Sequence, residues 1–207
     1  MPDLMVAVPR GALLGETLDL LDGLGIDTAE VRSNDRRLLF EEAGIVTMRP
    51  SDVPTYVEHG SADIGIVGKD VLLEQSQRNV YELLDLGFGR CRMVVAARSG
   101  GDPIGAAVRR LGRVRIATKY PRVAAAHFAH TGRQAEIVEV KGSVELAPLT
   151  GLVDGIVDLT ATGRTLEENG LQVLEEIDVS TARLIANPVA HKLKAAQIDQ
   201  IVRRVRG

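Results

Sequence analysis

The fold of this chain is constrained most by an alternation of short apolar runs with segments of helical spacing. Between the runs, apolar residues recur at intervals of three and four, as in the stripe that includes Leu14, Leu18 and Leu21. Strands that alternate with helices are typical of α/β folds, so we expect mainly parallel sheets. The runs that read as buried strands are residues 4–8, 45–48, 63–67, 91–97, 114–117, 135–140 and 153–159.

The second half of the chain predicts a return to the first part of the fold. Residues 173–177 and 182–186 resemble strands, and residues 190–205 read as one amphipathic, basic helix. Glycines in the segment 86–92 interrupt two apolar runs and could turn the chain between two lobes. We therefore expect two lobes, formed by residues 1–90 with 180–207 and by residues 91–179.

Composition and charge exclude several classes of protein. No apolar run reaches the roughly 18 residues that a membrane-spanning helix needs. A net charge of −3 and the absence of tryptophan argue against a nucleic-acid partner. The single cysteine, Cys91, excludes an intramolecular disulfide, and the apolar stretch 4–8 is too short for a signal peptide. We expect a cytoplasmic protein with no membrane or nucleic-acid partner.

The chain also contains a weak internal similarity. Two sets of residues have identical spacing, and each reads as a strand followed by a glycine turn and a helix. If both turns lie at the carboxyl ends of strands, they could face one ligand, although chance similarity between two ordinary turns explains the match at least as well. The sets are Gly60, Asp63, Ile64, Gly68 and Lys69, and Gly155, Asp158, Leu159, Gly163 and Arg164.

Residues 154–170, DGIVDLTATGRTLEENG, carry the strongest chemical signal. A buried strand is expected to end near Asp158, and a threonine-rich loop follows it. Thr165 and Glu168 have the spacing of a capping box, which predicts a helix start directly after the loop. Backbone N–H groups, threonine hydroxyls and the positive end of a helix together favour binding of a phosphate.

Acidic residues before the loop restrict the kinds of ligand that fit this segment. Asp154 and Asp158 would repel a phosphate but can accept hydrogen bonds from sugar hydroxyls, so a ribose 5-phosphate fits the segment. An acid followed by TGxT is the pattern with which phosphoribosyltransferases hold phosphoribosyl pyrophosphate, although the two acids here are four positions apart rather than adjacent. Judged from the loop alone, a simple strand-to-helix turn in which Asp158 bonds local N–H groups explains the residues equally well.

Other segments decide between these interpretations. They are VPRGALL near the start, RPSDVPTYVEHGSADIGIVGKDVL, GFGRCRMVVA, and EVKGSVELAPLTGLVDGIVDLTATGRTL. In residues, order and spacing they closely resemble the ATP phosphoribosyltransferases, the first enzymes of histidine biosynthesis, from residue 4 to residue 186. The resemblance implies a two-lobed fold similar to type II periplasmic binding proteins, with a ligand cleft between the lobes.

The resemblance also implies the reaction. Adenine N1 of ATP attacks phosphoribosyl pyrophosphate to give phosphoribosyl-ATP and pyrophosphate, and Mg²⁺ accompanies the substrates without a dedicated protein site. Asp154 and Asp158 would face the ribose as catalytic residues. Contacts to phosphoribosyl pyrophosphate would come from Glu145, Leu159, Thr160, Ala161, Thr162, Gly163, Arg164 and Thr165. The nucleotide would be held by Pro9, Arg10, Gly11, Leu13, Arg32 and Arg49, although an ordinary surface salt bridge would also explain Arg49.

The end of the sequence at Gly207 leads us to expect the short form of the family, without a histidine-binding domain. The resemblance then implies a regulatory subunit similar to histidyl-tRNA synthetase, in a hetero-oligomer that contains a homodimer of this chain. The chain alone is expected to be weakly active or inactive. A competing hypothesis is a cytoplasmic anion- or solute-sensing module with the same two-lobed fold and no catalysis.

Overall fold

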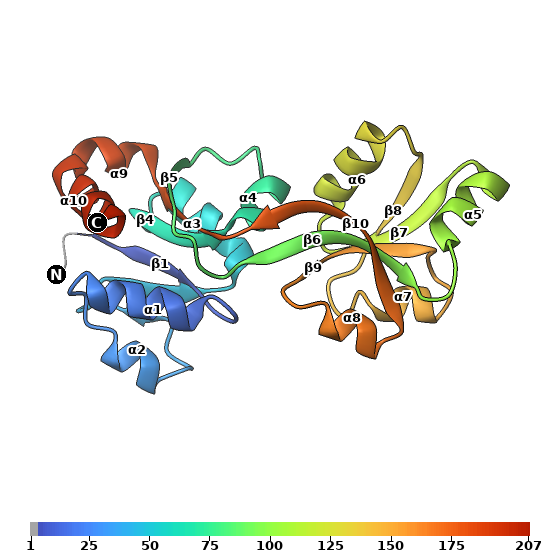
Figure 1. Ribbon diagram of the computed structural model, residues 1–207. Coiled ribbons are helices and arrows are strands. Elements are labelled where there is room, and N and C mark those ends of the chain that lie inside the picture. The colour runs from blue at the N-terminus through green and yellow to red at the C-terminus, as the bar shows by residue number, and fades with distance from the viewer. Residues whose placement is uncertain (1–3) are drawn as a thin grey trace. The chain divides into compact units, whose positions relative to one another are not determined.

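The computed structural model describes residues 4–207, and the chain divides into two compact units. Unit 1 comprises Met1–Gly89 and Thr181–Gly207, and unit 2 comprises Arg90–Ser180. The chain enters unit 2 on strand β6 (Cys91–Arg98) and leaves it on strand β10 (Leu171–Ser180). These two strands pair antiparallel and run side by side in Figure 1.

Unit 1 is built on a six-stranded sheet in the order β2-β3-β1-β4-β11-β5. Strands β3, β1 and β4 are parallel, whereas β2 pairs antiparallel with β3 and β11 pairs antiparallel with both β4 and β5. The strands are β1 (Val6–Pro9), β2 (Leu39–Phe40), β3 (Ile45–Met48), β4 (Ile64–Gly68), β5 (Tyr81–Asp85) and β11 (Ala182–Ala186).

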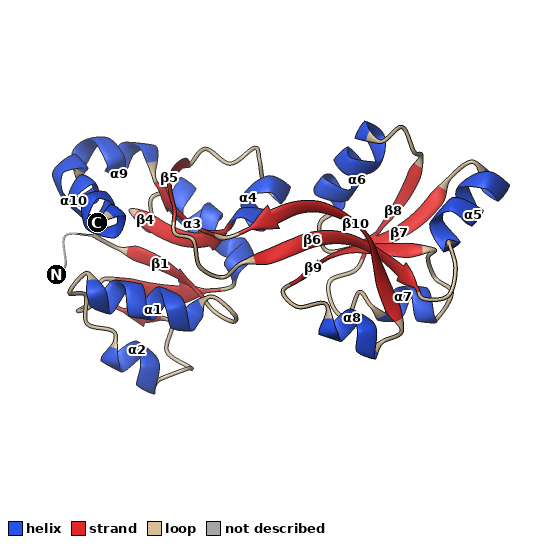
Figure 2. Cartoon of the chain, viewed as in Figure 1, coloured by secondary structure: helices blue, strands red, loops and turns tan. Residues whose placement is uncertain are grey.

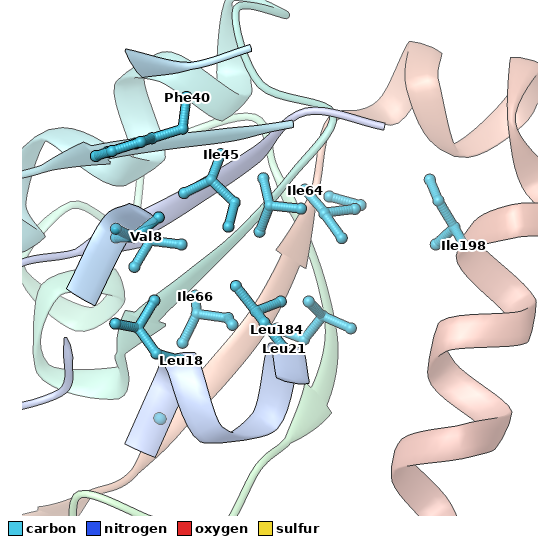
Figure 3. Close-up of a cluster of buried hydrophobic side chains, with 13 residues drawn as sticks. Val8, Leu18, Leu21, Phe40, Ile45, Ile64, Ile66, Leu184 and Ile198 are labelled. Atoms are coloured by element: carbon cyan, nitrogen blue, oxygen red, sulfur yellow. The ribbon is translucent and has the colours of Figure 1, made fainter. Parts of the chain in front are cut away.

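Helices cover both faces of this sheet and bury its apolar side chains. On one face, Leu18 and Leu21 of α1 and Ile198 of α10 join the strand residues Ile45 and Ile64 in a single cluster (Figure 3). On the other face, α3 and α4 supply a second cluster. The helical segments are α1 (Leu14–Gly23), α2 (Ala29–Ser33), η1 (Pro50–Asp52), α3 (Val53–Glu58), α4 (Lys69–Glu74), α9 (Pro188–Leu193) and α10 (Ala195–Arg206).

The prediction of a single C-terminal helix over residues 190–205 is wrong, because the structure has two helices there, α9 and α10. Asn187 caps a first helix, since its side chain accepts hydrogen bonds from the N–H groups of Val189 and Ala190. Lys194 then leaves helical geometry, with φ −118° and ψ 30°, and its ammonium pairs with Asp63 at 2.8 Å. The amphipathic pattern continues across this break, and for that reason the sequence alone did not reveal it.

Unit 2 is built on a five-stranded sheet in the order β10-β6-β9-β7-β8 (Figure 2). Strands β9, β7 and β8 are parallel, and β6 pairs antiparallel with both β9 and β10. Helices α5 and α6 pack on one face, and α7 and α8 pack on the other. The elements besides β6 and β10 are α5 (Pro103–Leu111), β7 (Val114–Thr118), α6 (Pro121–His130), β8 (Ala135–Glu139), α7 (Leu146–Leu149), β9 (Gly155–Thr160) and α8 (Arg164–Glu168).

The expected strands are present, but both sheets are mixed rather than mainly parallel. A buried strand has the same apolar pattern in either direction, so the sequence could not reveal that β6 and β11 run against their neighbours. Strand β9 also extends to Thr160, so that Asp158 lies inside the strand rather than at its end. Within residues 4–207, none of the helices is long and apolar enough to cross a membrane.

Candidate active site

The carboxyl ends of β7, β8 and β9 meet at one edge of the sheet in unit 2, because these strands are parallel. Each strand is followed by a turn into a helix: β7 leads to α6, β8 to α7 and β9 to α8. The first residues of β6 lie at the same edge, since Arg92 pairs with Thr160. In α/β sheets this edge is where ligands bind.

The turn between β9 and α8 is shaped by its own hydroxyl groups. Gly163 precedes α8 with φ 85°, a left-handed conformation that favours glycine. The hydroxyl of buried Thr160 accepts the N–H of Gly163 at 2.8 Å, and the hydroxyl of Thr162 accepts the N–H of Arg164 at 3.4 Å. Thr162 and Gly163 also line a surface pocket, together with Arg92 and Gln172. The expected loop is therefore a defined turn beside open space.

The capping box predicted for this turn is not formed. Helix α8 already begins at Arg164, so Thr165 lies inside it. The side chain of Glu168 pairs with Arg164 one turn earlier, at 2.8 Å, instead of reaching back past the helix start. Because this pair is exposed, its contribution to stability is small.

Asp158 is the buried acid of this edge. Only 7% of the residue is exposed, and its carboxylate accepts a hydrogen bond from the N–H of Leu159 at 2.9 Å. Burial raises the pKa of Asp158, whereas the bond from Leu159 and the charge of Lys119 lower it and the charge of Glu145 raises it further. The expected residues Glu145 and Asp158 are thus brought together.

Lys119 is a site residue that the sequence interpretation missed. It follows the last residue of β7, and its charge acts on Asp158 of the neighbouring strand. The available signal was its position: a lysine directly after the predicted strand 114–117, where a ligand edge is expected.

Asp154 lies at the opposite end of β9. Its carboxylate accepts the N–H of Arg115 at 2.8 Å, and its own N–H donates to the carbonyl of Arg115 at 2.9 Å. It lies four positions before Asp158 along extended backbone, which corresponds to roughly 13 Å. The expectation that both carboxylates face one ribose therefore does not fit this geometry, because the sequence showed two acids near one strand but not at which end each lies.

Unit 1 brings two of the expected arginines together. The N–H of Arg10 donates to the carbonyl of Met48 at 2.8 Å, and Pro9 pairs with Met48 in the sheet, so Arg10 and Arg49 follow neighbouring strand ends. Gly11 has φ 88° in the turn that follows, and Leu13 packs over Gly89. The residues 9–13 and Arg49 thus form one cluster at the carboxyl edge of this sheet.

Arg32 is placed elsewhere, in a network between α1 and α2. Its guanidinium pairs with Asp19 at 2.7 Å and with Asp22 at 2.8 Å, and its Nε donates to Thr28 at 3.0 Å. Two carboxylates already neutralise this arginine. The structure therefore does not support its expected role as a phosphate ligand.

The two similar sets of residues found in the sequence do not occupy equivalent positions in their strands. Asp63 precedes β4, whereas its expected counterpart Asp158 lies within β9. No group of three or more histidine, cysteine or acidic side chains within residues 4–207 is placed to hold a metal ion.

The two units, each with a mixed sheet covered by helices on both faces, are joined by two chain crossings and have the α/β fold of type II periplasmic binding proteins. Solved structures with this fold include the aliphatic sulphonate binding protein SsuA of Escherichia coli, with TM-score 0.61 and 13% identity over 98% of this chain and 70% of that one. The periplasmic VFT2 domain of BvgS from Bordetella pertussis matches with TM-score 0.60 and 16% identity over 98% and 92% of the two chains. At these identities the likeness concerns the fold alone.

The family model of HisG, ATP phosphoribosyltransferase, matches residues 49–207, and the chain belongs to this family. A relative of that name from Rubrobacter xylanophilus is 52% identical over 99% of this chain and 96% of its own length. ATP phosphoribosyltransferase 2 of Geobacter sulfurreducens is 46% identical over 95% and 94%. The solved HisG:HisZ complex of ATP phosphoribosyl transferase from Thermotoga maritima has a chain with TM-score 0.82 and 37% identity, over 98% of this chain and 96% of that one.

Membership of this family confirms the expected fold class and the expected enzyme, a pentosyltransferase of histidine biosynthesis. The competing hypothesis of a sensing module without catalysis is not supported.

Proposed function

We propose that unit 2 binds phosphoribosyl pyrophosphate at the carboxyl edge of its sheet, with residues 160–165 around the 5-phosphate and Asp158 facing the ribose. The observation that carries this proposal is the buried carboxylate of Asp158 next to the turn at Gly163. A carboxylate kept from water interacts more strongly with a developing positive charge than an exposed one does. Glu145 is a second acidic group at the same edge.

The nucleotide is proposed to bind at the carboxyl edge of the sheet in unit 1. The turn over residues 9–13 offers backbone groups, and Arg10 and Arg49 offer guanidinium groups for its phosphates. The hydrogen bond from Arg10 to Met48 supports this assignment, because it fixes the turn beside Arg49. Arg32 is left out of the proposed site, since Asp19 and Asp22 already occupy it.

The proposed reaction needs no protein nucleophile. The bond between the anomeric carbon and pyrophosphate breaks, the leaving group takes the electron pair, and adenine N1 supplies its lone pair to form the new bond. As the bond breaks, positive charge develops on the ribose ring, where the carboxylate of Asp158 stabilises it. Much of the remaining acceleration comes from holding two large anions in the correct orientation.

We propose that Mg²⁺ enters with the substrates rather than at a resident protein site. The acidic side chains named at this edge, Asp158, Glu145 and Glu139, are fewer than the ligands of an all-protein cage, and this suits a cation held mainly by substrate phosphates. When bound, the cation reduces the negative charge of the departing pyrophosphate.

The active form is proposed to be a hetero-oligomer in the cytoplasm. The Thermotoga maritima relative is described as a HisG:HisZ complex, which supports a partner subunit for this chain too. We propose that this partner is the regulatory subunit similar to histidyl-tRNA synthetase, that the complex contains a homodimer of this chain, and that the chain alone is weakly active or inactive.

A single assay tests the proposal. The chain is incubated with ATP, phosphoribosyl pyrophosphate and Mg²⁺, with and without the regulatory subunit encoded by the same organism, and N1-ribosylated ATP is measured by mass spectrometry. We expect the product with the complex, and a loss of roughly 100-fold or more for Asp158→Asn. Absence of product from the intact complex, or full activity of Asp158→Asn, would contradict the proposal.

A further inference from the structure

Lys119 lies level with Asp158 on the neighbouring strand. Thr118, the last residue of β7, pairs with Val157 of β9, and Lys119 and Asp158 are the residues that directly follow this pair. Lys119 and Asp158 are therefore neighbours at the carboxyl edge, where the charge of Lys119 acts on the carboxylate of Asp158.

The backbone on both sides of Lys119 is fixed. The hydroxyl of fully buried Thr118 accepts the N–H of Tyr120 at 2.8 Å, and the ring of Tyr120 packs against the core between the sheet and helices α5 and α6. Pro121 then starts α6 with its restricted φ. Lys119 is itself exposed, so an ammonium with water access stands on a rigid turn beside a buried carboxylate.

The charged groups around Asp158 come from three further elements. Lys119 follows β7, Glu145 precedes α7, and Arg92 lies on β6, two residues from Val94, the strand partner of Asp158. Arg92 is paired with Glu176 on β10 at 3.3 Å. The charge of Glu145 opposes ionisation of Asp158, and the charge of Lys119 favours it. A cation is needed here, because burial alone disfavours the ionised form.

We propose that Lys119 is a positioning residue whose ammonium keeps Asp158 in its carboxylate form, ready to face the ribose. This inference rests on the proposed function of Asp158. A neutral carboxylic acid would offer the developing positive charge much less stabilisation, so loss of Lys119 should remove activity at acidic pH first.

The test is the pH dependence of kcat/KM for phosphoribosyl pyrophosphate, measured on the complex with its regulatory subunit. In Lys119→Met we expect the acidic limb to move to higher pH by about one unit, with activity near wild type above the limb. Lys119→Arg should restore the wild-type profile. Comparison between variants cancels the titration of the substrate phosphates, which is common to all.

The matched control is Lys141→Met. Lys141 follows β8 at the same edge, its side chain is 88% exposed, and Glu139 lies 3.8 Å away. The substitution removes the same charge, and we expect an unchanged limb. In an Asp158→Asn background, Lys119→Met should produce no further shift of the residual profile.

Three outcomes would overturn the role of Lys119 while the wild type remains active: an unshifted limb in Lys119→Met, an equal shift in Lys141→Met, or a uniform loss at every pH with a raised KM. The last result would indicate a direct contact with substrate phosphate. By contrast, an inactive wild-type complex, or an Asp158→Asn variant with full activity, would refute the proposed function itself. Thermal melting of each variant checks that the fold is intact.

Discussion

Asp63 and Asp154 occupy equivalent places in the two units. Each directly precedes a strand. Each also exchanges two hydrogen bonds with one residue that lies in the neighbouring parallel strand or just before it. Asp63 accepts the N–H of Met5 at 2.8 Å and donates its own N–H to the carbonyl of Met5 at 2.8 Å. Asp154 does the same with Arg115, at 2.8 and 2.9 Å. The two units thus have equivalent hydrogen bonds at the amino ends of these strands. Asp63 corresponds to Asp154, which lies four positions before the counterpart that the sequence suggested, Asp158.

This equivalence assigns Asp154 to the fold. Its side chain is 16% exposed, and the side chain of Asp63 is 14% exposed. We expect Asp154→Ala to lower the free energy of unfolding by about 1–3 kcal/mol, because the N–H of Arg115 loses its acceptor. Urea denaturation measures this change. The folded fraction of this variant should keep most of its activity per active site. A loss of activity as large as that of Asp158→Asn would instead indicate that Asp154 is a catalytic residue.

The ionisation of Asp158 should make stability depend on pH in a defined direction. Burial raises the pKa of Asp158 above the usual 3.8, so the folded state binds its proton more tightly than the unfolded state does. Its contribution therefore favours folding below pH 3.8 and is lost as the pH rises through the raised pKa. Asp158→Asn removes this titration and keeps an oxygen for the N–H of Leu159.

Chemical denaturation of wild type and Asp158→Asn across this pH range checks the sign. We expect the variant to gain stability relative to wild type as the pH increases, with a constant difference at neutral pH. If the variant instead loses stability relative to wild type as the pH rises, Asp158 is stabilised as a carboxylate in the free protein.

The turn at Gly163 should be sensitive to a side chain through its backbone. With φ at 85°, Gly163→Ala requires a left-handed alanine, at a cost of roughly 1–2 kcal/mol. The turn can escape this strain by shifting, so we expect a raised KM for phosphoribosyl pyrophosphate and little change in the KM for ATP.

Gly112→Ala provides the matched control, because Gly112 has φ 70° at the end of α5, before β7 and away from the carboxyl edge. Its backbone strain is similar, but its effect should be confined to stability. Equal KM changes in both variants would indicate a general loosening of unit 2 rather than a role of the turn.

The arginines of unit 1 should separate into two groups. Arg49 is exposed at a strand end beside Arg10, and we expect Arg49→Ala to raise the KM for ATP by roughly 10-fold, the loss of one charge-assisted contact. Arg32→Ala should leave this KM unchanged and lower the melting temperature slightly, because it breaks contacts with Asp19 and Asp22. Steady-state kinetics and a thermal melt distinguish these results, and the reverse assignment would place Arg32 in the nucleotide site.

Local sequence was sufficient wherever the signal lies within a few neighbouring residues. Strands Ile45–Met48 and Ala182–Ala186 have the predicted bounds, because their apolar runs end at polar or turn-forming residues. The turn directly after the buried strand β9 was also predicted, since small and hydroxylated residues there leave few alternatives, and the structure forms it over residues 161–163. Asp158 was expected at this site for the same reason.

Features that depend on the pairing of strands and charges could be seen only in the folded structure. Asp154 and Asp158 are similar acids near one strand, and only the pairing of β9 with β7 shows that one meets Arg115 and the other meets Lys119. Arg32 is likewise paired with Asp19 and Asp22 of the preceding helix, a contact that depends on how α1 and α2 pack. Apolar periodicity records which side chains are buried, but strand direction, register and the partner of each charge arise from contacts between segments far apart in the chain. Residue patterns along the chain were therefore enough to predict the class of fold and the loop, whereas the three-dimensional arrangement shows which charged residues near that loop can act together.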